Sequence, residues 1–203
     1  MKHVLSVIAV MAAMSSLAAP AYAQTGGGGG GGTTTWKAIA AGALESPPNP
    51  SPGSAAVTID VTGQQLFVDD LFRDLTGDTT AAHIHCCTSA AFTGTAPIAV
   101  PFTDFPTGVR AGGYNQAIAL DTDTSYAPAF LSAHGGTAAS ASSALLDAIA
   151  ANEAYINIHT STYPNGEVRG WLVSAPVPEP GEWAMLAGGL AGLAGAARMR
   201  RRR

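Results

Sequence analysis

Apolar and polar residues alternate most clearly in a segment near the end of the chain. In residues 155–159, Ile156 and Ile158 fall on one face, while the polar and aromatic positions, ending in His159, fall on the other. A period of two is typical of a strand with one buried face. We therefore predict a strand here, with His159 on its outer face.

A turn and a second alternating segment follow. Residues 164–166 (Pro-Asn-Gly) have the composition of a tight turn, because proline presets φ while asparagine and glycine tolerate positive φ. In residues 168–173 the first valine and the leucine share one side, and Arg169 lies on the other. We expect the chemistry of the chain near His159 and Arg169.

The rest of the central region has the pattern of a β protein. One helix is expected at residues 142–152, where serine can cap the start and leucine and isoleucine share a face. These elements predict an all-β domain, either a Greek-key β-sandwich or a small barrel, with one short helix. The other expected strands are residues 36–44, 55–61, 65–71, 81–87, 96–102 and 109–120.

Both ends of the chain differ from this region. Residues 1–23 have a short basic start, an apolar run and a small-x-small ending, which is typical of a signal peptide cleaved after Ala23. Residues 24–35 are a glycine- and threonine-rich linker. The β domain is therefore expected at residues 36–175.

The C-terminal end has an uncharged apolar stretch followed by arginines. Residues 183–197 would form a membrane helix about 22 Å long, which is short for a hydrocarbon core of about 30 Å. The arginine end would stay cytoplasmic. A short span of this kind suits transient residence in the inner membrane.

Composition and charge narrow the class of protein. Hydrophobic residues make up 47% of the 203 residues and charged residues 12%, which suits one globular domain with appended segments. Residues 24–175 contain four basic and twelve acidic side chains, a balance of −8. An acidic domain without a basic stripe is not expected to bind nucleic acid.

Three histidines are candidate metal ligands. His83 and His85 share one face of a predicted strand, with Ile84 on the other face, and His159 lies on another strand. Two imidazoles two positions apart can reach one ion, and a third would complete a set suited to copper or zinc. The alternative is a pair of polar residues on an exposed face.

Cys86 and Cys87 are the only cysteines. In an oxidising compartment they could form a vicinal disulfide, which we favour, or an intermolecular bridge. Cys87 could instead be a soft metal ligand, and Cys86 a buried thiol.

Other polar residues are expected to have structural roles. The acidic cluster of Asp69, Asp70, Asp74 and Asp78 lacks the spacing of a calcium loop and is interpreted as a solvated rim. His134 is expected to lie in a loop outside any site. No motif of a hydrolase or of a dinucleotide-binding enzyme is present.

The C-terminal end resembles the PEP-CTERM sorting signal of Gram-negative bacteria. The resemblance covers residues 177–203, with Val177-Pro178-Glu179-Pro180, the apolar stretch and the arginine cluster in the expected order. It implies an exosortase-type processing enzyme as a partner. It also implies export across the inner membrane to the cell surface or the extracellular matrix, with transient membrane anchoring.

The β domain resembles the CHRD domain, which is named for chordin. The resemblance lies in residues 82–85, 155–160 and 164–170, and extends over residues 36–173. It implies a secreted binding or structural module and supplies no catalytic residues. Family members often carry glycine and proline where this chain has Cys86 and Cys87.

The same pattern is also similar to copper/zinc superoxide dismutase. That resemblance implies that His83, His85 and His159 bind copper and that Arg169 guides the anion, although no residue matches the bridging histidine or the zinc cluster. Otherwise Arg169 is expected to form a structural ion pair. We therefore predict a non-enzymatic surface or matrix module, with a copper protein of redox activity as the alternative.

Overall fold

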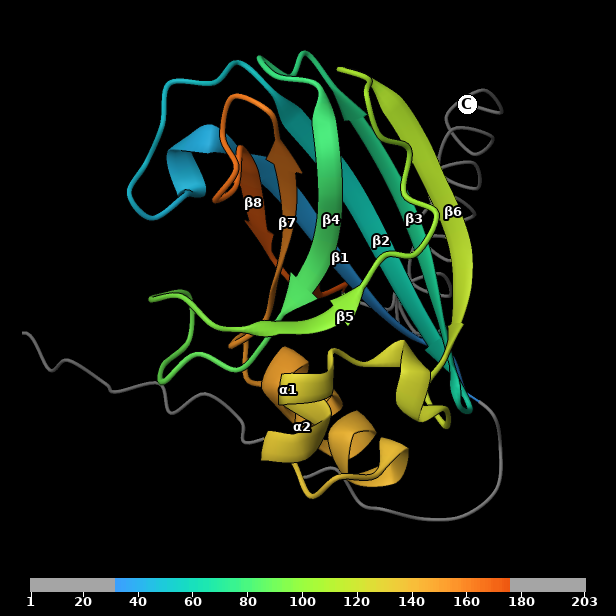
Figure 1. Cartoon of the computed structure of the whole chain (residues 1–203). Coiled ribbons are helices and arrows are strands. Elements are labelled where there is room, and N and C mark those ends of the chain that lie inside the picture. The colour runs from blue at the N-terminus through green and yellow to red at the C-terminus, as the bar shows by residue number, and fades with distance from the viewer. Residues whose placement is uncertain (1–31, 176–203) are drawn as a thin grey trace, which may run out of the picture. The chain divides into compact units, whose positions relative to one another are not determined.

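The computed structural model describes residues 32–175. Figure 1 shows a curled sheet with a pair of helices beside one end of it. The strands are β1 (Thr34–Ala41), β2 (Ser54–Thr62), β3 (Gln65–Arg73), β4 (Thr79–His85), β5 (Ile98–Pro101), β6 (Gly112–Ala119), β7 (Tyr155–Thr160), β8 (Val168–Trp171) and β9 (Val173–Ser174). The helices are η1 (Gly42–Leu44), η2 (Asp123–Ser125), α1 (Pro128–Ala133) and α2 (Ala138–Ala150).

All nine strands belong to one antiparallel sheet. Its order is β5-β4-β7-β8-β1-β2-β3-β6, and β9 pairs with β1. The sheet curls into a half-barrel (Figure 1). The prediction of a mostly β domain is confirmed, and the small barrel describes it better than two sheets packed face to face.

The β2–β3 hairpin shows how sequence pattern sets the register. Thr62 pairs with Gln65, so residues 63 and 64 form the loop, and Gly63 has a φ of 60°. Along both strands buried and more exposed positions alternate, which places Ile59 opposite Val68 in the core. A slip of one residue would turn these side chains to solvent.

The helices differ from the prediction of one short helix. The expected helix at residues 142–152 is α2, which begins at Ala138 because Thr137 caps it by accepting a hydrogen bond from the Ser140 amide. A second helix, α1, starts at Pro128 and has only six residues. Six residues are too few for helical periodicity to be visible in a sequence.

Two features concern the ends of the domain. Strand β1 begins at Thr34, within the range expected to be linker. The expected signal peptide, sorting motif and membrane helix lie outside the described residues. Within residues 32–175, no helix combines the length and the apolar character needed to span a bilayer.

Candidate metal centre

Strand pairing brings together three histidines from distant parts of the sequence. Strands β4 and β7 are antiparallel neighbours, with Ala81 opposite His159 and His85 opposite Tyr155. His83 and His85 are two positions apart on β4 and share a face, and His159 is diagonal to His83. One ring nitrogen from each histidine lies within 4.8 Å of the others.

The intervening aliphatic residues explain why these rings share a face. Ala82, Ile84, Ile156 and Ile158 point to the opposite side and are buried in the core. The histidine face is itself partly covered, because His85 is only 8% exposed and the other two rings are half-buried. The three rings therefore form a recessed cluster, not the open surface that the alternation predicted.

Backbone carbonyls determine which nitrogens face the cluster. His85 Nδ1 lies 2.9 Å from the Ala96 carbonyl, and His159 Nδ1 lies 3.0 Å from the Pro164 carbonyl. A carbonyl only accepts hydrogen bonds, so each Nδ1 carries the proton and each Nε2 keeps its lone pair. Histidines that bind a metal commonly donate a hydrogen bond from the other ring nitrogen to a backbone carbonyl in this way.

One buried ring nitrogen of each of the three histidines has no protein hydrogen-bond partner. Among the described residues, His83 Nδ1, His85 Nε2 and His159 Nε2 are buried and make no hydrogen bond. Buried polar atoms are normally hydrogen-bonded, because each unpaired one lowers the stability of the fold. Three imidazole nitrogens without a protein partner, gathered in one place, are chemically suited to coordinate one metal ion.

Electrostatics keeps the three rings neutral. Burial is the main cause that lowers the pKa of His83 to about 4, and the nearby His159 and His85 lower it further. Burial also lowers the pKa of His85 to about 4, against the opposing effect of the Ala96 hydrogen bond. Burial lowers the pKa of His159 as well. Neutral imidazoles at pH 7 are the form that binds copper or zinc.

The spacing is close to that of a metal site. Bonds of about 2.0–2.1 Å to one ion would place the ligand nitrogens about 3.3–3.6 Å apart. The three nitrogens lie within 4.8 Å of one another, so small rotations of the rings would bring them to the spacing of metal ligands. Within residues 32–175, no other group of three ligating side chains comes this close.

Tyr155 supports His85 from the side. The two rings are stacked, with centroids 5.0 Å apart and planes 2° from parallel. The Ala96 amide donates to the Tyr155 hydroxyl at 3.1 Å, so Tyr155 also holds the residue whose carbonyl binds His85. Sequence reasoning missed Tyr155, although it shares a face of β7 with His159.

Arg169 lies behind this stack and is largely buried. Its guanidinium is 4.8 Å from the centroid of Tyr155 and 5.4 Å from that of Trp171. Its Nε donates to the Leu44 carbonyl at 2.7 Å, and its Nη1 donates to the Gly94 carbonyl at 3.0 Å. Neither of the two ion pairs in the described residues involves it, so the expected direct ion pair is not formed.

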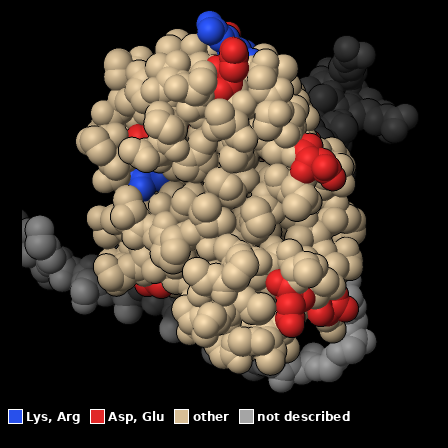
Figure 2. Space-filling model, viewed as in Figure 1, with Lys and Arg blue, Asp and Glu red and all other residues tan. Residues whose placement is uncertain are grey.

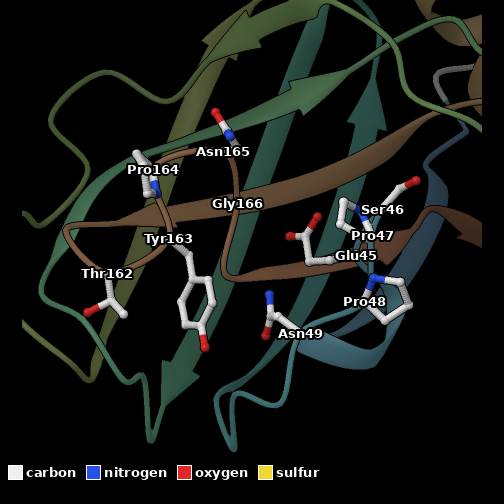
Figure 3. Close-up of a pocket in the computed structure, with 10 residues that line it drawn as sticks. All are labelled: Glu45, Ser46, Pro47, Pro48, Asn49, Thr162, Tyr163, Pro164, Asn165 and Gly166. Carbon is white, nitrogen blue, oxygen red and sulfur yellow. The ribbon is translucent and has the colours of Figure 1, made fainter.

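A pocket of about 240 Å³ is linked to the histidine cluster through Pro164. Figure 3 shows it between the segment from Glu45 to Asn49 and the turn from Thr162 to Gly166. Burial raises the pKa of Glu45 to about 7, against the effect of nearby Arg169. The turn that forms one wall of the pocket includes Pro164, whose carbonyl orients His159.

Other candidates from the sequence lie apart from the cluster. Cys86 and Cys87 are joined by a disulfide directly after His85, with Cys86 fully buried. His134 packs against Phe130 on α1. Asp70 is only 1% exposed, so its assignment to a solvated rim is wrong. Its position opposite Val57 and Tyr114 on buried strands accounts for this.

Comparison with models of known families matches residues 36–172 to the CHRD domain. The matched range includes the three histidines, Tyr155 and Arg169, and ends before the C-terminal motif. No curated protein and no solved structure matches the chain.

Proposed function

Since the chain belongs to the CHRD domain family, we propose that this member is an exported module that binds one copper ion through His83, His85 and His159. One observation carries the proposal: three imidazoles come together, and each has a buried ring nitrogen without a protein partner. Two of them are already oriented by backbone carbonyls, so the site would need little rearrangement to bind an ion.

The ligand set favours copper among the divalent metals. Neutral imidazoles suit copper, zinc and nickel, and copper(II) has the highest intrinsic affinity for such donors. Magnesium and calcium prefer oxygen ligands, which the cluster does not supply. Bound copper would supply one-electron chemistry, while the protein contributes three fixed nitrogens in a recess.

The proposed role is binding rather than catalysis. The resemblance to copper/zinc superoxide dismutase would make Arg169 the residue that guides the anion. However, two nitrogens of Arg169 donate hydrogen bonds to carbonyl oxygens, and its side chain is largely buried. A non-enzymatic surface or matrix module that holds copper fits this placement best. A redox or dismutase-like activity is the second candidate, because the His-x-His strand and the later histidine form a shared cluster.

The metal test uses mature protein purified from the cell envelope. Metal analysis after copper loading is expected to give one copper per chain for the wild type. Stoichiometric copper should be lost in His83→Ala and His159→Ala and kept in His134→Ala, a matched control outside the cluster. Copper retained in both site variants would disprove the assignment. A dismutase assay on loaded protein decides between the two candidate roles.

The export route is proposed from the sequence of the two ends. The signal segment, Val177-Pro178-Glu179-Pro180, the apolar stretch and the arginines support processing by an exosortase-type enzyme and delivery to the surface or matrix of a Gram-negative cell. Replacing Pro178, Glu179 and Pro180 by alanine should leave an unprocessed, membrane-associated form. Fractionation and intact mass measure this. Unchanged processing of that variant would contradict the route.

A further inference from the structure

A second hollow lies beside the cluster of three histidines and shares His83 with it. It has a volume of about 600 Å³ and is an open groove between β5 and the start of α1. Volumes of this size are typical of sites for small organic ligands. The lining residues that matter here are His83, Ile98, Asp123, Tyr126, Ala127 and Leu131.

Most of the polar groups around this groove are already engaged. The Asp123 carboxylate accepts a hydrogen bond from the Ala138 amide at 2.7 Å, and the Tyr126 hydroxyl donates to the Leu120 carbonyl at 2.8 Å. Figure 2 shows few charged side chains on the face of the molecule that contains β5 and α1. The groove is therefore suited to an uncharged and largely apolar molecule.

A metal ion bound by the three histidines would determine which nitrogen of His83 carries a proton toward this groove. His83 Nδ1 is buried and has no hydrogen-bond partner, and one ring nitrogen of His83 lies within 4.8 Å of a ring nitrogen of each of the other two histidines. Nδ1 is therefore the nitrogen that we assign to the ion. A neutral imidazole that binds a metal through Nδ1 must carry its proton on Nε2. The half-buried ring of His83 lines the groove, so a loaded site would present one N–H donor against an apolar wall.

We propose that this groove binds a small, uncharged, largely apolar molecule with a carbonyl oxygen that accepts a hydrogen bond from His83 Nε2–H. The metal strengthens this binding by fixing the tautomer of His83, a step that rests on the function proposed above. The Asp123 carboxylate and the acidic domain disfavour an anionic ligand at the same place. The ligand class is thus a neutral ketone, ester or amide with an apolar body.

The test uses prodan, a neutral naphthyl ketone whose fluorescence depends on polarity, with the mature full-length protein. The wild type should bind it with a blue shift. Leu131→Trp and Ala127→Leu, which fill the groove to different extents, should each weaken binding, Leu131→Trp by tenfold or more. Leu71→Trp on the exposed sheet surface is the matched control and should bind like the wild type. Equal binding by Leu131→Trp and wild type, with both variants folded by circular dichroism, would overturn the groove assignment.

The metal coupling is tested with Zn²⁺, which does not quench the probe by redox chemistry. One added hydrogen bond predicts that prodan affinity rises about two- to tenfold on zinc loading. The rise should be absent in His159→Ala, which keeps the groove but loses a ligand. Binding of one zinc ion per chain without any change in prodan affinity would disprove the link between metal binding and the groove. Prodan binding in a protein that takes up no metal would refute the metal site and leave the groove standing.

Discussion

Two carbonyl oxygens select the reactive nitrogen of two histidines. The Ala96 and Pro164 carbonyls each accept a hydrogen bond from Nδ1, which leaves the Nε2 lone pairs of His85 and His159 directed into the cluster. Free imidazole exchanges between tautomers, and here the exchange is suppressed before any ion arrives. The cluster is preorganised, and preorganisation increases affinity by reducing the cost of ordering on binding.

Tyr155→Phe tests the support for His85. The change removes the hydroxyl that accepts from the Ala96 amide and keeps the stacked ring. We expect copper affinity to fall by up to about tenfold, because the Ala96 carbonyl loses its anchor. Competition titration measures this.

The electron paramagnetic resonance spectrum of bound copper(II) separates positioning from a general structural effect. Its nitrogen hyperfine pattern should shift in Tyr155→Phe and not in Tyr163→Phe, whose ring lines the neighbouring pocket. An unchanged affinity and spectrum in Tyr155→Phe would show that the hydroxyl does not position His85.

Asp70 is a buried carboxyl without a hydrogen-bond partner among the described residues. Burial is the main cause that raises its pKa from 3.8 to about 7, and the nearby Asp69 carboxylate adds to the effect. The folded state therefore holds a proton that the unfolded chain releases at lower pH. Stability must fall as the pH rises from about 4 to about 7, in total by about 4 kcal/mol.

Asp70→Asn should abolish this part of the pH dependence. Urea unfolding at pH 4 and pH 8 is expected to show a clear loss of stability in the wild type and a much smaller one in the variant. Asp147→Asn, on the exposed side of α2, is the matched control and should behave like the wild type. A wild type equally stable at both pH values would contradict the raised pKa.

At the scale of elements, one carboxylate joins three loops around the β7–β8 turn. Glu167 is fully buried and accepts hydrogen bonds from the Ser51 and Thr160 hydroxyls and from the Thr76 and Gly77 amides. Burial alone would raise its pKa, but the hydrogen bonds outweigh burial and lower it. The turn that carries the Pro164 carbonyl is thereby fixed to the rest of the sheet.

Glu167→Gln should lower the free energy of unfolding by about 1–3 kcal/mol at pH 7, because charge-assisted hydrogen bonds are lost. A lowered pKa means that this contribution is present above pH 4.5 and is lost as the pH falls through the folded-state pKa. The difference between variant and wild type should therefore shrink in acid. Chemical denaturation measures this difference, and Glu153→Gln, at a half-buried position, is the control. A difference in stability that does not change with pH would contradict an ionised Glu167 carboxylate.

The elements that the sequence predicted well are those with strict alternation. Strands β2 and β3 contain the expected segments, because each has one buried and one less buried face. Strand β7 also contains its expected segment, although both of its faces are largely buried. Helix α1 and the early start of α2 were missed. Six residues carry too little periodicity, and the capping role of Thr137 depends on a local backbone shape that composition alone does not specify.

At the scale of the whole molecule, metal binding should stabilise the entire fold, because the ligands belong to paired strands within one sheet. At a free copper concentration of 100 times Kd, the gain is about 2.7 kcal/mol. For a domain of this size the melting temperature should rise by about 5–10 °C. Calorimetry checks this, and His159→Ala should show no shift. A shift of equal size in His159→Ala would place the copper elsewhere.

The cluster of three histidines could be predicted only in part. Alternation placed His83 and His85 on one face and His159 on the outer face of another strand, but it could not show that β4 and β7 are neighbours. The pairing depends on the curl and order of the sheet. The carbonyls of Ala96 and Pro164 and the committed guanidinium of Arg169 were also invisible, because backbone groups have no signature in the sequence.

If the protein is exported and binds copper as proposed above, the strand pairing that forms the histidine cluster also sets when copper can be acquired. His85 and His159 are 74 positions apart in the sequence and meet only after β7 has paired with β4. A chain threaded unfolded through a secretion channel would have no assembled site, so it would cross the membrane empty. Loading would then take place in the compartment where the domain folds, and the copper supply outside the cytoplasm would determine how much of the protein is filled.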